Sequence, residues 1–358
     1  MQKVSRIDPN FQKHMQLEVQ GDYAIKKDEK DIDTALKFYK QAATIKPEYF
    51  EVYIKMGKCF EKDKDFENAT KNFQKAVDLN KTSPWAHFRL GWIFIRNGDR
   101  LKGIEHMKKS LSFDPKNADV LTKLGEVLLR EPNTFDEAEQ FLKRALSIDE
   151  NIPDALVSMG RIWEKKGNLE EATRCYEKAL KQPVTNINAY YYLGVIHEKR
   201  KDYKKSIQLF KQCLLVDQEH FGACLHLATL QANAGEAQKA AKYFKHALKL
   251  DPNNIPANFG LGKILHSTSD NAESAIPYYE FVIKNDPKHH KAFCQLGIVY
   301  LEKGNLEKAA EFLKQCLQIQ PKYVLGLVSM GNLLFETGHS KTAAKYHQQA
   351  LKYNPKEI

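Results

Sequence analysis

One pattern of small and aromatic residues recurs about every 34 residues through this chain of 358 residues. The clearest copy spans 153–183 and predicts two helices joined by a tight turn at Gly167. A glycine inside a helix costs about 1 kcal/mol relative to alanine. We expect the cost at Gly160 to be offset because it faces Ala172 of the second helix, so that the two axes approach closely while Tyr176 fills the adjacent space.

The small residue of the first helix returns at intervals of 34 to 36 residues. Its positions are Gly21, Gly57, Gly91, Gly125, Gly160, Gly194, Ala228, Gly262, Gly297 and Gly331. The small residue of the second helix is found at Ala35, Ala69, Ala138, Ala172, Ala240, Ala275, Ala309 and Ala343. One helix pair leaves an apolar flank uncovered, and the next pair would bury it. The pattern therefore predicts a continuous array of helix pairs rather than separate globular cores.

This pattern, with a proline closing many of the copies, resembles the tetratricopeptide repeat (TPR) family. The resemblance covers roughly residues 9–358 in ten consecutive copies. It implies an all-α fold, a right-handed α-solenoid of about ten helix-turn-helix units. We expect an N-terminal arm or lead-in at 1–15 and a TPR superhelix over 16–358. The expected units are 16–49, 50–83, 84–117, 118–152, 153–186, 187–220, 221–254, 255–289, 290–323 and 324–358.

Two local features qualify the expected array. Pro277 lies one turn into an expected second helix, so we expect that helix to start late or to kink. The sequence stops at Ile358, directly after the tenth expected second helix and without a polar cap. We therefore expect a longer natural protein; the alternatives are that a partner or a second copy of the chain covers this end.

The composition points to a reducing compartment. Cys213 and Cys316 occupy positions where other copies have a buried alanine, and no cysteine belongs to a CxxC pair. We expect all six cysteines to be free thiols, as is usual inside cells. No apolar run is long enough to span a membrane, and the N-terminus lacks the apolar stretch of a secretory signal. We expect an intracellular, cytoplasmic protein, with the nucleus and the cilium as alternatives.

No catalytic or cofactor-binding motif stands out. The sequence lacks the motifs of phosphate-binding loops, zinc proteases and serine hydrolases. The glycines between Phe259 and Lys263 fall inside an expected helix, and His289 and His290 have no further ligands at metal-binding spacing. We therefore predict that the chain is not an enzyme and binds neither a cofactor nor a metal ion.

The resemblance implies that the first helices line a concave groove, and basic residues recur on them at fixed distances from the small residue. The candidate partner-binding residues are Lys55, Lys58, Lys62, Arg89, Trp92, Arg96, Lys123, Arg130, Arg161, Lys165, Tyr191, Tyr192 and Lys199. Such a ladder would suit an extended acidic segment of a partner protein. The competing hypothesis is a merely solvated groove, because cations near a helix C-terminus also complement its dipole. That effect does not explain Lys55, Arg89 and Lys123, which lie in mid-helix.

The sequence favours a non-catalytic scaffold for protein–protein contacts in a multi-subunit assembly. It lacks the asparagines of TPR domains that bind chaperone carboxylates and the asparagine ladder of the O-GlcNAc transferase family. One alternative is the substrate-selecting region of a larger enzyme of the glycosyltransferase or ubiquitin-ligase type. The net charge of +10 also permits an RNA-associated helical-repeat protein, which we regard as the weakest of the three hypotheses.

Overall fold

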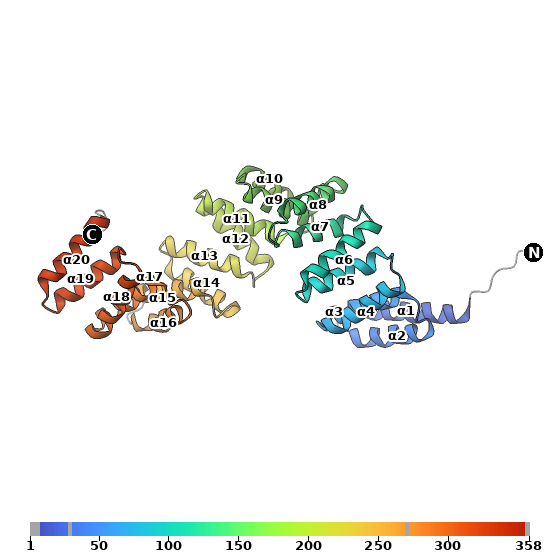
Figure 1. Cartoon of the computed structure of the whole chain (residues 1–358), viewed down its shortest axis with the longest axis horizontal. Helices are drawn as coiled ribbons and strands as arrows, with labels where there is room; N and C mark the ends of the chain where they lie inside the picture. Colours follow the sequence, from blue (N-terminus) through green and yellow to red (C-terminus); the bar gives the residue numbers. More distant parts are fainter. Residues whose placement is uncertain (1–7, 28–30, 269–271, 355–358) are drawn as a thin grey trace, which may run out of the picture. The chain divides into compact units, whose positions relative to one another are not determined.

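The computed structural model describes residues 8–27, 31–268 and 272–354, and every regular element in these ranges is a helix (Figure 1). The helices are α1 (Pro9–Lys27), α2 (Ile32–Ile45), α3 (Phe50–Lys62), α4 (Phe66–Leu79), α5 (Pro84–Arg96), α6 (Arg100–Phe113), α7 (Ala118–Leu128), α8 (Phe135–Ile148), α9 (Pro153–Lys165), α10 (Leu169–Leu180), α11 (Ile187–Lys199), α12 (Tyr203–Val216), α13 (Phe221–Asn233), α14 (Ala237–Leu250), α15 (Ile255–Thr268), the 3-10 helix η1 (Ala272–Ala275), α16 (Ile276–Asn285), α17 (His290–Glu302), α18 (Leu306–Ile319), α19 (Val324–Glu336) and α20 (Ser340–Tyr353).

The helices pack in consecutive pairs. Each odd-numbered helix, here called the A helix, lies against the even-numbered B helix that follows it, from α1 on α2 to α19 on α20. Within each unit the B helices also contact the next A helix, for example α2 with α3 and α14 with α15. This arrangement confirms the predicted all-α solenoid of repeated helix pairs. In the described ranges no helix is both long and apolar enough to cross a membrane.

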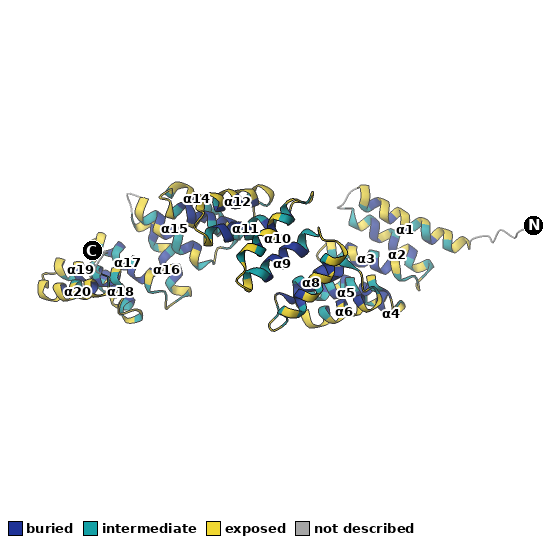
Figure 2. Cartoon of the chain, turned by 90° about the horizontal axis from the view of Figure 1, so that it is seen from above, coloured by how far each residue is buried: buried dark blue, intermediate teal, exposed yellow. Residues whose placement is uncertain are grey.

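The chain forms two compact units, Met1–Asn186 and Ile187–Ile358. The first unit contains α1 to α10 and the second contains α11 to α20. In each unit the helices have buried residues on the faces toward neighbouring helices and exposed residues on their outer faces (Figure 2).

Short-range sequence signals explain where the B helices begin. Asp31, Asp65, Asp99 and Asn168 each precede a B helix, and each accepts a hydrogen bond from the backbone N–H three residues later. Such caps satisfy backbone donors that the first helical turn leaves without a partner. Before the last of these caps, Gly167 has a φ of +79°, which suits glycine because it has no Cβ.

Most A-helix glycines make room for a large side chain rather than for the predicted small residue; Gly91 is different, since a Cβ there would lie nearest to the backbone oxygen of Gly103, at 2.8 Å. A Cβ on Gly160 would lie 2.4 Å from Cε1 of Tyr176, and a Cβ on Gly57 would lie 2.5 Å from Cε1 of Phe73. Ala172 is fully buried but is not among the atoms nearest to that Cβ position. The predicted close crossing exists, and the ring that follows the alanine by one helical turn occupies the space that glycine leaves.

The pair α13–α14 lacks the glycine of this series. Ala228, which is fully buried, replaces it in α13. The corresponding ring, Phe244 of α14, lies instead against the next A helix, where a Cβ on Gly260 would be 2.3 Å from its Cζ atom. The alanine at position 228 and the glycine at position 260 therefore have one physical cause, the position of the Phe244 ring.

Two further expectations can be compared with the structure. The residues around Pro277 form η1 and then α16, with Pro277 in the first turn of α16, which confirms the late start of that helix. Five of the six cysteines are buried, and Cys175 is half-buried. Burial raises the pKa of the Cys59 and Cys224 thiols to about 11, so both stay protonated at neutral pH.

Candidate partner-binding face

The predicted basic residues of the first unit lie on its A helices. Helix α3 carries Lys55, Lys58 and Lys62; α5 carries Arg89, Trp92 and Arg96; α7 carries Lys123, with Arg130 just beyond its end; α9 carries Arg161 and Lys165. We call the surface formed by these side chains the A-helix face of the first unit. The remaining candidates, Tyr191, Tyr192 and Lys199, lie on α11 in the second unit.

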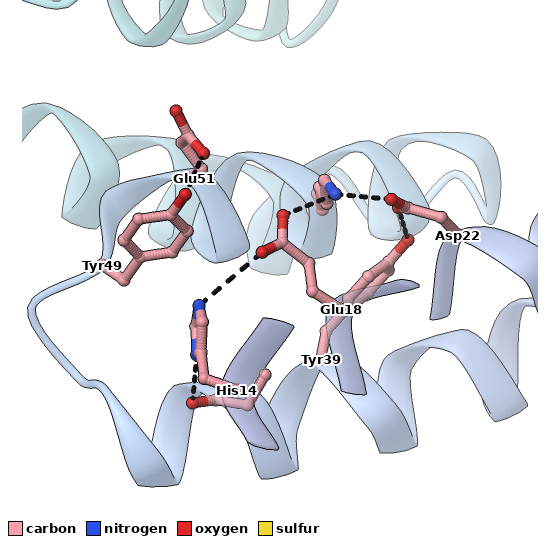
Figure 3. Close-up of polar contacts among 8 residues, drawn as sticks. His14, Glu18, Asp22, Tyr39, Tyr49 and Glu51 are labelled. Atoms are coloured by element: carbon pink, nitrogen blue, oxygen red, sulfur yellow. Dashed lines mark hydrogen bonds and ion pairs between the residues drawn. The ribbon is translucent and has the colours of Figure 1, made fainter. Parts of the chain in front are cut away.

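Lys55 connects α3 to α1 through two carboxylates. Its Nζ atom lies 2.5 Å from Oε1 of Glu18 and 2.6 Å from Oδ2 of Asp22 (Figure 3). Burial alone would lower the pKa of Lys55, but its hydrogen bonds to Asp22 and Glu18 outweigh that effect and raise it. Tyr39 of α2 donates a hydrogen bond of 2.7 Å to the same Asp22. Lys55 therefore belongs to a polar network that joins the first two helix pairs.

The inner end of this network is buried. The Glu18 side chain is 5% exposed, and its Oε2 atom lies 3.6 Å from Nε2 of the fully buried His14 (Figure 3). The other ring nitrogen of His14 lies 3.0 Å from the carbonyl oxygen of Ala42. A buried carboxylate is costly unless a cation compensates its charge. Lys55 supplies that charge, so its first role in this structure is to compensate Glu18.

The other two mid-helix cations also face carboxylates of a neighbouring A helix. Glu61 of α3 lies 3.3 Å from Nη1 of Arg96 and 4.0 Å from Nη1 of Arg89. Burial lowers the pKa of Arg89, and Glu61 offsets only part of this effect.

Lys123 of α7 lies 3.0 Å from both Asp154 of α9 and Glu126 of its own helix. Burial opposes the charge of Lys123, but the two carboxylates prevail and raise its pKa. The mid-helix positions, which a helix dipole does not explain, thus acquire a structural explanation as bridges between A helices.

An exposed tryptophan lies between two cations of this face. Trp85 is the second residue of α5 and is 51% exposed, with Nζ of Lys58 5.5 Å and Cζ of Arg89 5.4 Å from its ring centroid. Lys58 makes no ion pair with any described residue, and burial together with the charges of Arg89 and Lys55 lowers its pKa. Trp85 is not among the residues predicted from the sequence. The helical spacing from Trp85 through Arg89 to Trp92 could have revealed it.

The remaining candidates of the first unit differ in exposure. Trp92 is half-buried and packs against a core cluster, so it presents little surface to a partner. Arg130 is exposed and has no ion pair within the described ranges. Lys165 is also exposed, with its Nζ atom 5.2 Å from the ring centroid of Phe135. Arg161 is half-exposed, and Lys62 lines a cavity of about 250 Å³ together with Lys55 and Lys58.

In the second unit, Tyr191 and Tyr192 form part of an aromatic cluster. Their ring centroids are 5.2 Å apart, and the Tyr191 ring also lies 4.7 Å from that of His220 and 5.8 Å from that of His226. Both tyrosines are half-buried, whereas Lys199 is exposed near the end of α11. Among the described residues, no group of three or more His, Cys, Asp or Glu side chains is arranged to hold a metal ion.

Family models match several of the predicted repeats. Models described as "Tetratricopeptide repeat" match residues 50–83, 86–117, 187–220, 221–254 and 290–323. A model described as "TPR repeat" matches residues 160–201. Together these matches cover more than half of the sequence, and the chain belongs to the tetratricopeptide repeat family. Its helix pairs accordingly form a scaffold for protein–protein interactions.

Solved structures of other TPR proteins resemble this chain. YrrB, described as "a TPR protein with an unusual peptide-binding site", is 26% identical with a TM-score of 0.48, and the match covers 52% of this chain and 95% of YrrB. PilF of Pseudomonas aeruginosa is 18% identical with a TM-score of 0.51, covering 58% and 94%. A monomeric mutant of IFIT1 with m7Gppp-AAAA is 16% identical with a TM-score of 0.56, covering 89% and 77%. The last two support the fold alone. No curated protein sequence matches this chain.

Proposed function

We propose that this chain is a non-catalytic scaffold whose first unit binds an extended acidic segment of a partner protein on its A-helix face, within a multi-subunit assembly. The observation that carries the proposal is the exposed Trp85 between Lys58 and Arg89. Tryptophan and arginine are common anchors in protein interfaces. A carboxylate placed beside Trp85 would supply the negative charge that Lys58 lacks, while the ring would pack against an apolar side chain.

Two groups of cations have different roles in this proposal. Lys58, Arg130 and Lys165 are exposed and make no ion pair within the described ranges, so they are available to a ligand. Each screened contact would contribute about 0.5 kcal/mol, so affinity depends on several contacts along the segment. The mid-helix cations, which already pair with carboxylates, mainly fix the spacing of the A helices.

The proposal extends to the organisation of the chain and its place in the cell. We propose that residues 16–358 act as one repeat array after a lead-in at 1–15, and that Tyr191, Tyr192 and Lys199 contribute a separate contact in the second unit. We also propose an intracellular setting, because the buried thiols suit reducing conditions.

The test uses charge reversal at the available cations. We expect K58E/R130E/K165E in the full chain to lose the partners that the wild type captures in affinity purification with mass spectrometry. Reversal at Lys55 or Lys123 would be ambiguous, because it would place a second carboxylate beside those already there and weaken the fold. The matched control is K37E/K40E/K116E, which makes the same change in net charge at exposed lysines elsewhere in the first unit.

Three outcomes separate the hypotheses. Loss of partners in the first variant alone, with unchanged helicity, supports an acidic ligand on the A-helix face. Retention of the same partners by that variant contradicts the proposal. Partners that disappear after nuclease treatment, with affinity falling steeply with salt, would favour the RNA-associated alternative.

A further inference from the structure

A cavity of about 730 Å³ opens on the A helices of the second unit, at α13, α15 and the start of α17. Phe244, Phe259 and Ile264 supply its apolar lining, and Lys263 and Lys291 also line it. This volume lies in the range typical of ligand pockets, which combine an apolar lining with a few polar groups.

The cavity lies beside Gly260 and the Phe244 ring, which pack against each other. Gly260 stands at the helix position that carries Lys55 in α3 and Arg89 in α5, so α15 has no side chain at this position. The Phe244 ring, which packs against Gly260, reaches the opening from the B-helix side and forms part of its wall. A hollow with an aromatic wall therefore replaces the basic ladder in this repeat.

The charges around the cavity are unbalanced. Lys263 and Lys291 are exposed, and neither makes an ion pair with a described residue. Asp286 also lines the cavity, but its carboxylate accepts a hydrogen bond of 3.1 Å from the backbone N–H of Lys288. His289 adds no charge at neutral pH, because burial lowers its pKa, and its Nδ1 atom accepts a hydrogen bond from the N–H of Ala292. The opening therefore carries a net positive charge.

We propose that this cavity is an anchor pocket for a partner peptide that carries a bulky apolar side chain next to a carboxylate. The apolar side chain would displace water from Phe244, Phe259 and Ile264, and the carboxylate would pair with Lys263 and Lys291. The lysines and the apolar lining lie side by side in the cavity. An extended peptide fits this arrangement, because two neighbouring residues can present an apolar side chain and a carboxylate side by side. This proposal rests on the proposed scaffold function of the chain, but it does not depend on a ligand at the A-helix face of the first unit.

The experiment is a selection of displayed random peptides on the full-length chain. We expect enrichment of sequences with Phe, Leu, Trp or Met directly beside Asp or Glu. An enriched peptide, synthesised with a fluorescent label, should lose affinity by about tenfold for K263E/K291E, because the lysines are replaced by repelling charges. T229W should produce a loss of similar size, because Thr229 is exposed at the cavity and a larger side chain there fills it.

The control K245E/K284E makes the same change in net charge on the B helices α14 and α16. It should bind the labelled peptide as the wild type does. The variant K58E/R130E/K165E should also retain the peptide, which separates this pocket from the proposed site in the first unit. The proposal is overturned if no such motif is enriched, or if K263E/K291E and T229W bind the peptide unchanged. It is equally overturned if sedimentation shows a wild-type dimer that T229W dissociates, since a second copy would then fill the pocket.

Discussion

At the scale of single residues, the A-helix glycines mark the places where a B-helix side chain crosses its partner helix. Gly194 and Gly262 leave this space to Phe210 and Tyr279, as Gly57 and Gly160 do in the first unit. A large side chain thereby comes to lie against the partner backbone, which excludes water from the crossing. The glycine series is therefore a packing requirement and needs no ligand to explain it.

The exceptional pair predicts an energetic coupling between positions 228 and 260. We expect Gly260→Ala to destabilise the chain by about 1–3 kcal/mol, because the new Cβ would overlap the Phe244 ring. Ala228→Gly should cost about 1 kcal/mol through helix propensity. The double variant should lose about 1 kcal/mol less than the sum, because the ring can then move over position 228. Urea unfolding of the four proteins measures this coupling, and strict additivity would contradict the explanation.

At the scale of helices, ion pairs join successive A helices, although a B helix lies between them in the sequence. Glu61 of α3 reaches Arg96 of α5, and Asp154 of α9 reaches Lys123 of α7. These side chains are partly exposed, so each such pair contributes modestly. The pair of Lys55 with Glu18 differs, because the carboxylate is buried and depends on its cation.

Lys55→Met should therefore destabilise the α1–α2 pair by about 2 kcal/mol, because it leaves Glu18 buried without a compensating charge. Hydrogen exchange of the α1 and α2 amides measures the effect. Lys71→Met removes an exposed pair with Glu67 on α4 and should leave stability almost unchanged, because solvent screens that pair. Equal effects of the two substitutions would show that burial of Glu18 carries no special cost.

At the scale of the whole molecule, each helix pair contacts mainly its neighbours, and the contacts form two compact units. In repeat proteins of this kind, stability is approximately a sum of repeat and nearest-neighbour terms. A local defect should therefore loosen the repeats around it and leave distant repeats unchanged.

This locality is testable with one substitution in each unit. Gly57→Ala places a Cβ 2.5 Å from Phe73, and Gly297→Ala places one 2.6 Å from Leu313. Each should destabilise its own unit by about 1–3 kcal/mol. We expect the first to speed amide exchange in α1 to α6 and the second in α15 to α20. If either substitution lowered protection evenly through the whole chain, unfolding would be a single cooperative event and the locality would be wrong.

The sequence by itself determined the helix pairs and the face on which the basic residues lie. Both depend on spacings within one repeat, because the helical period decides which face of a helix each residue lies on. The family followed from the same spacings, and the late start of α16 followed from Pro277.

Only the tertiary structure decided which cations are already paired. The carboxylates of Asp22, Glu61 and Asp154, which bridge to Lys55, Arg96 and Lys123, come from 31 to 35 residues away, in a neighbouring repeat. It also decided that Trp92 is half-buried while Trp85 is exposed, and that Phe244 packs against Gly260. Such contacts depend on how one helix pair stacks on the next, and no spacing within a single repeat encodes that stacking.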